Sequence, residues 1–190
     1  KDQAGSERVL RFKALLDASG EHSFLADRMG WRFPYPRHRK IAACGRFRGV
    51  RLPEGRAAGN VAVVLAPGGW FRLLPFADGS VSVEAVLDEA LWGSAGSGAE
   101  ALLAAAVERT PEAARRLAAA EPMQPAATVR NFSYRVMKTA GDSFCLIGDA
   151  AGFLDPIFST GIFIATTTGA AAADDIVDAL RRHGRVEAND

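Results

Sequence analysis

SFCLIGDAAGFLDPIFSTGIFIA, residues 143–165, predicts a short apolar strand, a glycine-containing turn, a second turn and a long apolar helix in close succession. The second turn is Asp155-Pro156. Pro156 fixes its own φ and restricts Asp155, so the chain is expected to bend just before the helix begins. The stretch therefore predicts the strand–turn–helix unit of an α/β fold.

The polar residues of this unit point to a ligand site. Gly148-Asp149 ends the strand, which leaves a carboxylate at the carboxyl edge of a sheet, where α/β folds bind ligands. A carboxylate there can accept hydrogen bonds from a ribose diol. The helix opens with the small residues Ser159, Thr160 and Gly161, which leave its free N–H groups open to an electron-rich ligand. The alternative is an ordinary strand–turn–helix with a capping aspartate.

GDAAGFLDPIFSTGIFIA resembles the second FAD-binding motif of the flavin-dependent halogenases and related FAD-dependent monooxygenases. In that family the aspartate of Gly-Asp holds the FAD ribose, and the segment after Asp-Pro lies along the pyrophosphate and isoalloxazine. Transferred by position, the resemblance implies cofactor-binding roles for Gly148, Asp149, Asp155, Pro156, Ser159, Thr160 and Gly161.

A second match lies near the start of the sequence. Residues 7–16 are predicted to form a strand that returns from a turn at residues 1–6 and runs into Asp17-Ala18-Ser19-Gly20. This tetrad resembles one that closes a strand beside the dinucleotide in the same family, which adds Asp17, Ser19 and Gly20 to the expected cofactor residues. A plain strand-to-helix turn capped by Asp17 or Ser19 is an equally good interpretation.

The middle of the chain has a β pattern. Four apolar segments with tight turns between them predict an antiparallel meander, at residues 41–50, 60–66, 70–74 and 81–87. Two helices at residues 99–109 and 111–120 and a further strand at residues 128–135 are expected to follow. In the resembled family, such a sheet faces the substrate and covers the flavin.

Within this sheet, Trp70-Phe71-Arg72-Leu73-Leu74-Pro75 lines up with the halogenase signature Trp-x-Trp-x-Ile-Pro. The resemblance implies that Trp70, Arg72 and Pro75 line the substrate pocket, although Trp70 is equally compatible with a sheet-core aromatic. Arg72 replaces the second tryptophan of the signature. Because a guanidinium is costly to bury alone, we expect Arg72 either to face solvent or to pair with an anionic group.

The fold class implied is α/β for the family and α+β within these residues. Residues 1–30 and 136–190 are expected to form part of a glutathione-reductase-like FAD-binding domain. Residues 31–135 are expected to form an antiparallel substrate-binding sheet with two helices.

Composition limits the other possibilities. The net charge of +1 gives no general attraction to nucleic acid. Residues 157–173 carry no charge, but their glycines and threonines and the preceding proline favour a buried helix over a membrane span. Cys44 and Cys145 do not form a disulfide framework and favour a reduced, cytoplasmic location. His22 and His38 have no second ligand at metal spacing, so no metal site is predicted.

The resemblance implies an FAD-dependent oxidoreductase of monooxygenase or halogenase type, in which a flavin hydroperoxide modifies a small organic, preferably aromatic, substrate. A flavin reductase or NAD(P)H would supply electrons. A flavin-dependent reductase of isoprenoid double bonds and a truncated non-catalytic domain are the alternatives. The family's Gly-x-Gly-x-x-Gly unit and catalytic lysine have no match in these 190 residues. No catalytic residue is therefore predicted, and the chain alone is expected to be inactive.

Overall fold

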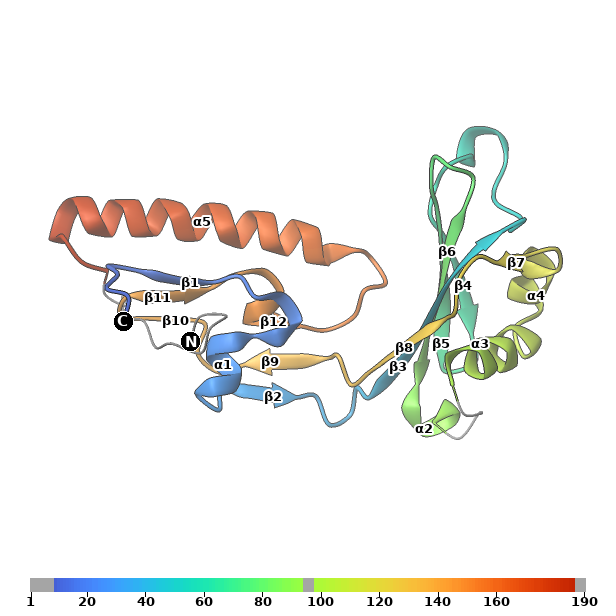
Figure 1. Cartoon of the computed structure of the whole chain (residues 1–190), viewed down its shortest axis with the longest axis horizontal. Helices are drawn as coiled ribbons and strands as arrows, with labels where there is room; N and C mark the ends of the chain where they lie inside the picture. Colours follow the sequence, from blue (N-terminus) through green and yellow to red (C-terminus); the bar gives the residue numbers. More distant parts are fainter. Residues whose placement is uncertain (1–8, 94–97, 187–190) are drawn as a thin grey trace. The chain divides into compact units, whose positions relative to one another are not determined.

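The computed structural model describes residues 9–93 and 98–186. The chain divides into two compact units, which we describe separately. Unit 1 comprises residues 1–33 and 134–190, and unit 2 comprises residues 34–133 (Figure 1). The described residues form helices and mostly antiparallel sheets, which confirms the mixed α/β class.

Unit 2 is built on a six-stranded sheet with the strand order β4-β5-β6-β3-β7, and β8 also pairs with β3. Every pairing in it is antiparallel. The strands are β3 (Lys40–Arg48), β4 (Ala62–Ala66), β5 (Gly69–Pro75), β6 (Val81–Asp88), β7 (Glu121–Pro122) and β8 (Ala127–Arg130).

The predicted meander is correct for β4, β5 and β6 but wrong for β3. β3 pairs with β6, and β4 lies at the far edge of the sheet. The reason is the connection after β3, which contains a 3-10 turn (η2, Gly55–Ala57) and is too long for a hairpin. A pattern of alternating residues identifies strands, but it does not specify which strands become neighbours.

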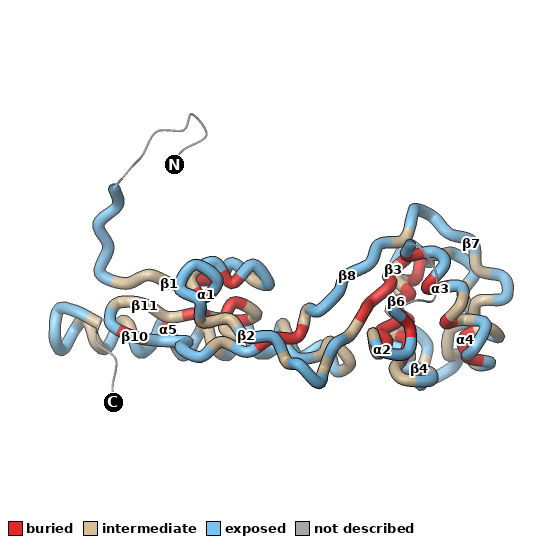
Figure 2. The backbone as a smooth tube through the Cα atoms, turned by 90° about the horizontal axis from the view of Figure 1, so that it is seen from below, coloured by how far each residue is buried: buried red, intermediate tan, exposed pale blue. Residues whose placement is uncertain are grey.

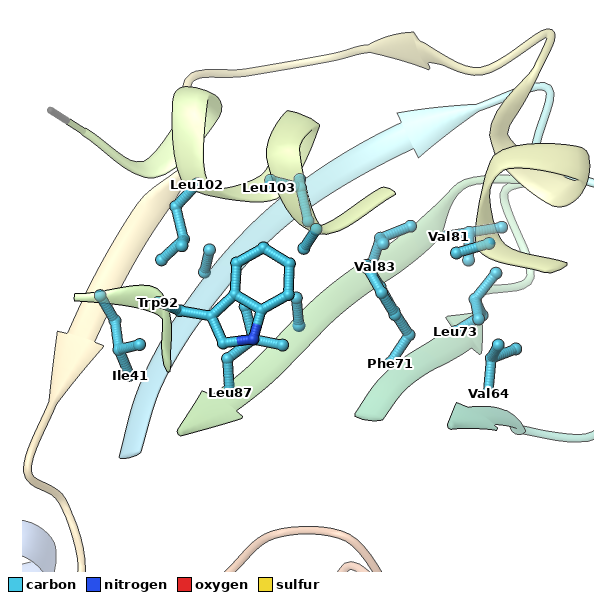
Figure 3. Close-up of a cluster of buried hydrophobic side chains, with 14 residues drawn as sticks. Ile41, Val64, Phe71, Leu73, Val81, Val83, Leu87, Trp92, Leu102 and Leu103 are labelled. Atoms are coloured by element: carbon cyan, nitrogen blue, oxygen red, sulfur yellow. The ribbon is translucent and has the colours of Figure 1, made fainter. Parts of the chain in front are cut away.

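Three helices complete unit 2: α2 (Glu89–Trp92), α3 (Ala99–Glu108) and α4 (Pro111–Leu117). Their apolar residues pack on one face of the sheet, as Figure 3 shows for Trp92, Leu102 and Leu103. Because residues directly opposite each other in neighbouring strands share a face, Phe71 and Ala85 belong to this packed side. This cluster is the main hydrophobic core among the described residues of unit 2.

Unit 1 contains two small sheets. In the first, β1 (Leu15–Asp17) pairs in parallel with β11 (Phe144–Leu146), and β10 (Ala140–Gly141) lies on the other side of β11. In the second, the order is β12-β9-β2. Its strands are β2 (Arg32–Pro34), β9 (Tyr134–Val136) and β12 (Gly152–Phe153). The helices of the unit are α1 (Phe24–Arg28) and α5 (Thr160–His183), with 3-10 turns η1 (Gly20–His22) and η3 (Gly148–Ala151).

Two strand predictions need correction. Residues 9–14 are not in a strand, so β1 is much shorter than expected, and the predicted turn at residues 1–6 lies outside the described residues. The single strand predicted at residues 128–135 is two strands, β8 and β9, in different sheets. Asn131 has a positive φ of 53°, which interrupts extended backbone between them.

The expectation of a buried helix after Asp155-Pro156 is wrong for the described structure. In the first part of α5 and just before it, Phe158, Ile162 and Phe163 are 81%, 78% and 69% exposed. Figure 2 shows α5 coloured mainly as exposed. An uncharged run indicates a helix with an apolar surface, but it does not reveal what covers that surface. Among the described residues, no helix has the length and apolar character needed to cross a membrane.

Candidate cofactor site

The Gly-Asp turn lies between β11 and α5, and Gly148 determines how closely the helix approaches it. Gly148 has a φ of 58°, and a Cβ added to it would lie 3.0 Å from the Cβ of Ala165. Its N–H donates a hydrogen bond of 2.9 Å to Oγ1 of Thr168. Both the positive φ and the close contact favour glycine at this position, where it lets α5 pack directly on η3.

The beginning of α5 lies beside the carboxylate of Asp149. A Cβ added to Gly161 would be 3.5 Å from Oδ1 of Asp149. Asp155 and Pro156 form the predicted turn before the helix: Oδ1 of Asp155 accepts the N–H of Ile157 at 2.9 Å. The structure thus brings Asp149 and the first turn of α5 together, whereas the Asp155 carboxylate is engaged in its own turn.

The pKa of Asp149 is raised above its ordinary value, first by burial and then by repulsion from Glu21. No described residue donates a hydrogen bond to its carboxylate. A carboxylate that is partly removed from water without a donor retains the capacity to accept hydrogen bonds from a ligand. The neighbouring Glu21 makes a neutral diol a better ligand for it than an anion.

Asp17 and Ser19 have a different environment, because their polar atoms are used within unit 1. Asp17 Oδ1 accepts the N–H of Ser19 at 3.0 Å, and Oδ2 accepts the N–H of Leu25 at 2.6 Å. Ser19 Oγ accepts the N–H of Phe24 at 2.8 Å. Burial opposes ionisation of Asp17, but the Ser19 hydroxyl and these N–H groups outweigh it, and the pKa is lowered. This is the geometry of the capped strand-to-helix turn, and Gly20 supplies its positive φ of 66°.

The turn at residues 17–20 nevertheless lies next to the Asp149 turn. β1 and β11 pair in register, and the Ile147 N–H donates to the backbone oxygen of Asp17 at 3.0 Å. Two further side chains contact the Asp149 turn through its backbone. Ser23 Oγ donates to the backbone oxygen of Ala150 at 2.6 Å, and Tyr134 Oη donates to the backbone oxygen of Asp149 at 2.5 Å. Sequence reasoning did not single out Ser23 in any role or connect Tyr134 with this turn.

The three predicted substrate residues of unit 2 are not brought together on one face. Trp70 is 5% exposed and lies opposite Val86, on the side of the sheet away from the α3–α4 core. Arg72 is on this same side, whereas Pro75 pairs with Val81 on the core side. Trp70 is thus buried without belonging to the core under the helices.

Arg72 pairs with an anionic group, as expected. Its guanidinium forms an ion pair with Glu84, which stands directly opposite it on β6. Glu84 Oε1 also accepts a hydrogen bond of 3.6 Å from the Cys44 thiol on β3. Burial and the negative charge of Glu84 raise the pKa of Cys44 to about 12. The described residues of the chain contain no group of three His, Cys, Asp or Glu side chains that could hold a metal ion.

Comparison with known proteins gives these features a context. No protein-family model matches the chain. A 1H-pyrrole-2-carbonyl-(peptidyl-carrier protein) brominase of Pseudoalteromonas luteoviolacea is 30% identical over 178 residues, which cover 92% of this chain and 44% of the brominase. A tryptophan 2-halogenase of Chondromyces crocatus is 28% identical over 182 residues, which cover 93% of this chain and 34% of the halogenase.

The solved structure of the myxobacterial chondrochloren halogenase CndH, described as a variant of FAD-dependent halogenases, superposes with a TM-score of 0.84 at 26% identity. This match covers 96% of the present chain and 43% of CndH. The chain is a relative of the flavin-dependent halogenases. The resemblance deduced from the Gly-Asp motif is thereby confirmed, and so is the fold class. The chain spans less than half the length of these halogenases.

Proposed function

We propose that the chain forms the Asp149-bearing part of an FAD-dependent oxidoreductase that halogenates an organic substrate. The observation that carries the proposal is the Asp149 carboxylate, which is partly buried, has no described donor and lies beside the first turn of α5. An FAD ribose offers two neighbouring hydroxyl donors that such a carboxylate can accept. The residues present therefore fit the group.

Each part of the site would have its own task. Asp149 would hold the ribose hydroxyls. Ser159, Thr160 and Gly161 would leave the N-terminal N–H groups of α5 open to electron-rich parts of the cofactor, at the positive end of the dipole of a 24-residue helix. When bound, FAD would supply oxygen activation. Asp155 and Pro156 would set the direction in which α5 starts, and Gly148 would keep the helix against the turn.

The side of the unit 2 sheet away from the helices bears on the substrate class. On the side of the sheet away from the helices, Leu65, Trp70, Val86 and Ala42 follow one another across four strands. The charge of Arg72 on this side is already balanced by Glu84. Of the four apolar side chains only Leu65 is exposed, at 79%, whereas Trp70, Val86 and Ala42 are at most 5% exposed. The proposed substrate class, an aromatic ring that is free or attached to a carrier, therefore rests on the relatives and on the neutralised charge of Arg72. Both relatives are named for substrates that contain an aromatic ring, tryptophan and a carrier-bound pyrrole.

Hydroxylation is the second candidate reaction, favoured by the Arg72 that replaces the second tryptophan of the halogenase signature. In either case a flavin reductase or NAD(P)H would supply the electrons, and we propose a cytoplasmic location because Cys44 and Cys145 are both free. The apolar side chains at the start of α5 are exposed. We propose that they are covered in a larger protein, as the relatives contain polypeptide beyond the part that matches this chain.

The natural gene product that carries this sequence tests the proposal when it is supplied with FAD, a flavin reductase, NADH, oxygen and bromide or chloride. Mass analysis of products from tryptophan and from carrier-bound pyrrole distinguishes the reactions. Halogenated product supports the proposal, and hydroxylated product alone favours the second candidate. A purified protein that neither binds flavin nor forms product would be a non-catalytic domain.

A further inference from the structure

Two consecutive carbonyl groups of the Asp149 turn are each held by a side-chain hydroxyl. The Tyr134 hydroxyl donates to the backbone oxygen of Asp149 at 2.5 Å, and the Ser23 hydroxyl donates to that of Ala150 at 2.6 Å. The donors come from separate parts of unit 1: Tyr134 begins β9, and Ser23 precedes α1. Two segments that are far apart in the sequence thus both donate to one short turn.

Both donors are almost entirely buried, so water cannot easily replace them. Tyr134 is 2% exposed and Ser23 is 0% exposed. Ser23 also has a positive φ of 41°, which is uncommon for a residue other than glycine. Burial of the hydroxyl and the positive φ of Ser23 both cost free energy. The hydrogen bond from Ser23 to the backbone oxygen of Ala150 offsets these two costs.

The tyrosine is itself held in place. The guanidinium of Arg32, on the neighbouring strand β2, lies 3.9 Å from the centre of its ring. Burial raises the pKa of Tyr134, so its hydroxyl stays protonated and remains a donor over the physiological range. In addition, Tyr134 pairs with Phe153 of β12, the strand that directly follows the turn. The ring therefore has little freedom to move away from the Asp149 carbonyl.

We infer that Ser23 and Tyr134 are positioning residues: they fix the η3 backbone so that the Asp149 carboxylate is presented to a ribose diol without making contact with the cofactor themselves. The inference rests on the proposed function of Asp149. Neither hydroxyl is directed to the carboxylate; they donate to the carbonyl oxygens of two consecutive peptide links, Asp149–Ala150 and Ala150–Ala151. Loss of either bond frees the turn and lets the carboxylate move into water.

The experiment uses the natural gene product that carries this sequence, isotope-labelled for NMR, in the wild type and in Tyr134→Phe and Ser23→Ala. Tyr35→Phe is the matched control, because Tyr35 is the other tyrosine of the chain and lies in unit 2. Phe144→Leu is a second control: it loosens the stacking of Phe144 on Trp31, at 5.4 Å between ring centres, in unit 1 without removing a hydrogen bond to the turn. Asp149→Asn tests the proposed function separately.

Three quantities are measured: the pKa of Asp149, the affinity for added FAD and the unfolding midpoint. Tyr134→Phe and Ser23→Ala should each weaken FAD binding about three- to tenfold, the scale of one lost hydrogen bond. They should also move the pKa of Asp149 down towards its ordinary value, because a freed carboxylate regains water. Tyr35→Phe and Phe144→Leu should leave both quantities unchanged, even where Phe144→Leu lowers the midpoint.

The pKa measurement needs no FAD, so weak binding does not prevent a decision, and Ser23→Ala decides if Tyr134→Phe fails to fold. If both hydroxyl variants match Tyr35→Phe in FAD affinity and in the pKa of Asp149 while Asp149→Asn weakens binding, the inference is wrong and the proposed function stands. If Asp149→Asn leaves FAD affinity unchanged, the proposed function fails and the inference falls with it.

Discussion

Replacement of Glu84 by glutamine should destabilise unit 2 substantially, because Arg72 would lose its counterion on a half-buried sheet surface. The Arg72 and Glu84 side chains are 21% and 13% exposed. Removal of one partner from a fully buried pair costs about 3–5 kcal/mol, whereas exposed pairs contribute about 0–1 kcal/mol. Since some water still reaches this pair, we expect about 2–3 kcal/mol for Glu84→Gln or Arg72→Met.

The double variant Arg72→Met/Glu84→Leu should recover most of that loss, because it leaves no unpaired charge and replaces the pair with apolar groups. Urea unfolding followed by tryptophan fluorescence measures the free energy of unfolding, and Trp70 and Trp92 report on unit 2. A control, Arg115→Met, breaks an exposed ion pair in α4 and should cost under about 1 kcal/mol.

The reasoning is refuted if each single substitution costs no more than Arg115→Met, since the pair would then behave as solvated. It is also refuted if the double variant is as unstable as the sum of the single variants. Either result would mean that Arg72 could bind an anionic substrate. The argument that its charge is neutralised by Glu84 would then no longer support an uncharged aromatic substrate.

Three further predictions concern individual groups. Cys44, with its pKa raised to about 12, should react slowly with iodoacetamide at pH 8, and Glu84→Gln should speed the reaction; labelling as fast as a free thiol would contradict this. Gly148→Ala should lower the free energy of unfolding by at least about 1 kcal/mol more than Gly184→Ala, because both glycines have positive φ but only Gly148 has a neighbour that an added Cβ would meet. The lowered pKa of Asp17 should add stability above its unfolded value of 3.8 that is lost as pH falls through the folded pKa, so thermal unfolding of Asp17→Asn between pH 6 and 3 should show a weaker pH dependence than the wild type.

The sequence identified local structure well where the pattern was strong. The segments predicted for β5 and β6 agree with the structure within a residue or two, because alternating apolar residues and Gly- or Pro-containing turns bound them on both sides. The Gly-Asp turn and the start of α5 were also located correctly, since Gly148 and Pro156 have conformational requirements that few other residues meet.

Features that depend on tertiary placement were missed. The position of β3 beside β6 follows from a long connection rather than from a local pattern. Ser23 donates to a backbone oxygen 127 positions away, and Tyr134 donates to one 15 positions away. Because every residue has a backbone oxygen, the sequence does not indicate which one a hydroxyl will contact. Tyr134 could have drawn attention as a tyrosine in an apolar strand context, because a buried hydroxyl requires a partner. Ser23 gave no such signal.

The central claim, that Asp149 is a cofactor ligand rather than a structural cap, is tested most directly by one paired measurement on the natural gene product and its Asp149→Asn variant: FAD affinity and the free energy of unfolding at pH 7. Because the pKa of Asp149 is raised on folding, the charged carboxylate lowers the free energy of unfolding at any pH above its unfolded pKa, including pH 7. Replacing it with the neutral asparagine should therefore not destabilise the protein. Hydrogen bonds to a charged group contribute about 1.5–3 kcal/mol, so FAD binding should weaken at least about tenfold. Unchanged FAD affinity together with a large loss of stability would show that Asp149 is a cap and that the account of the site is wrong.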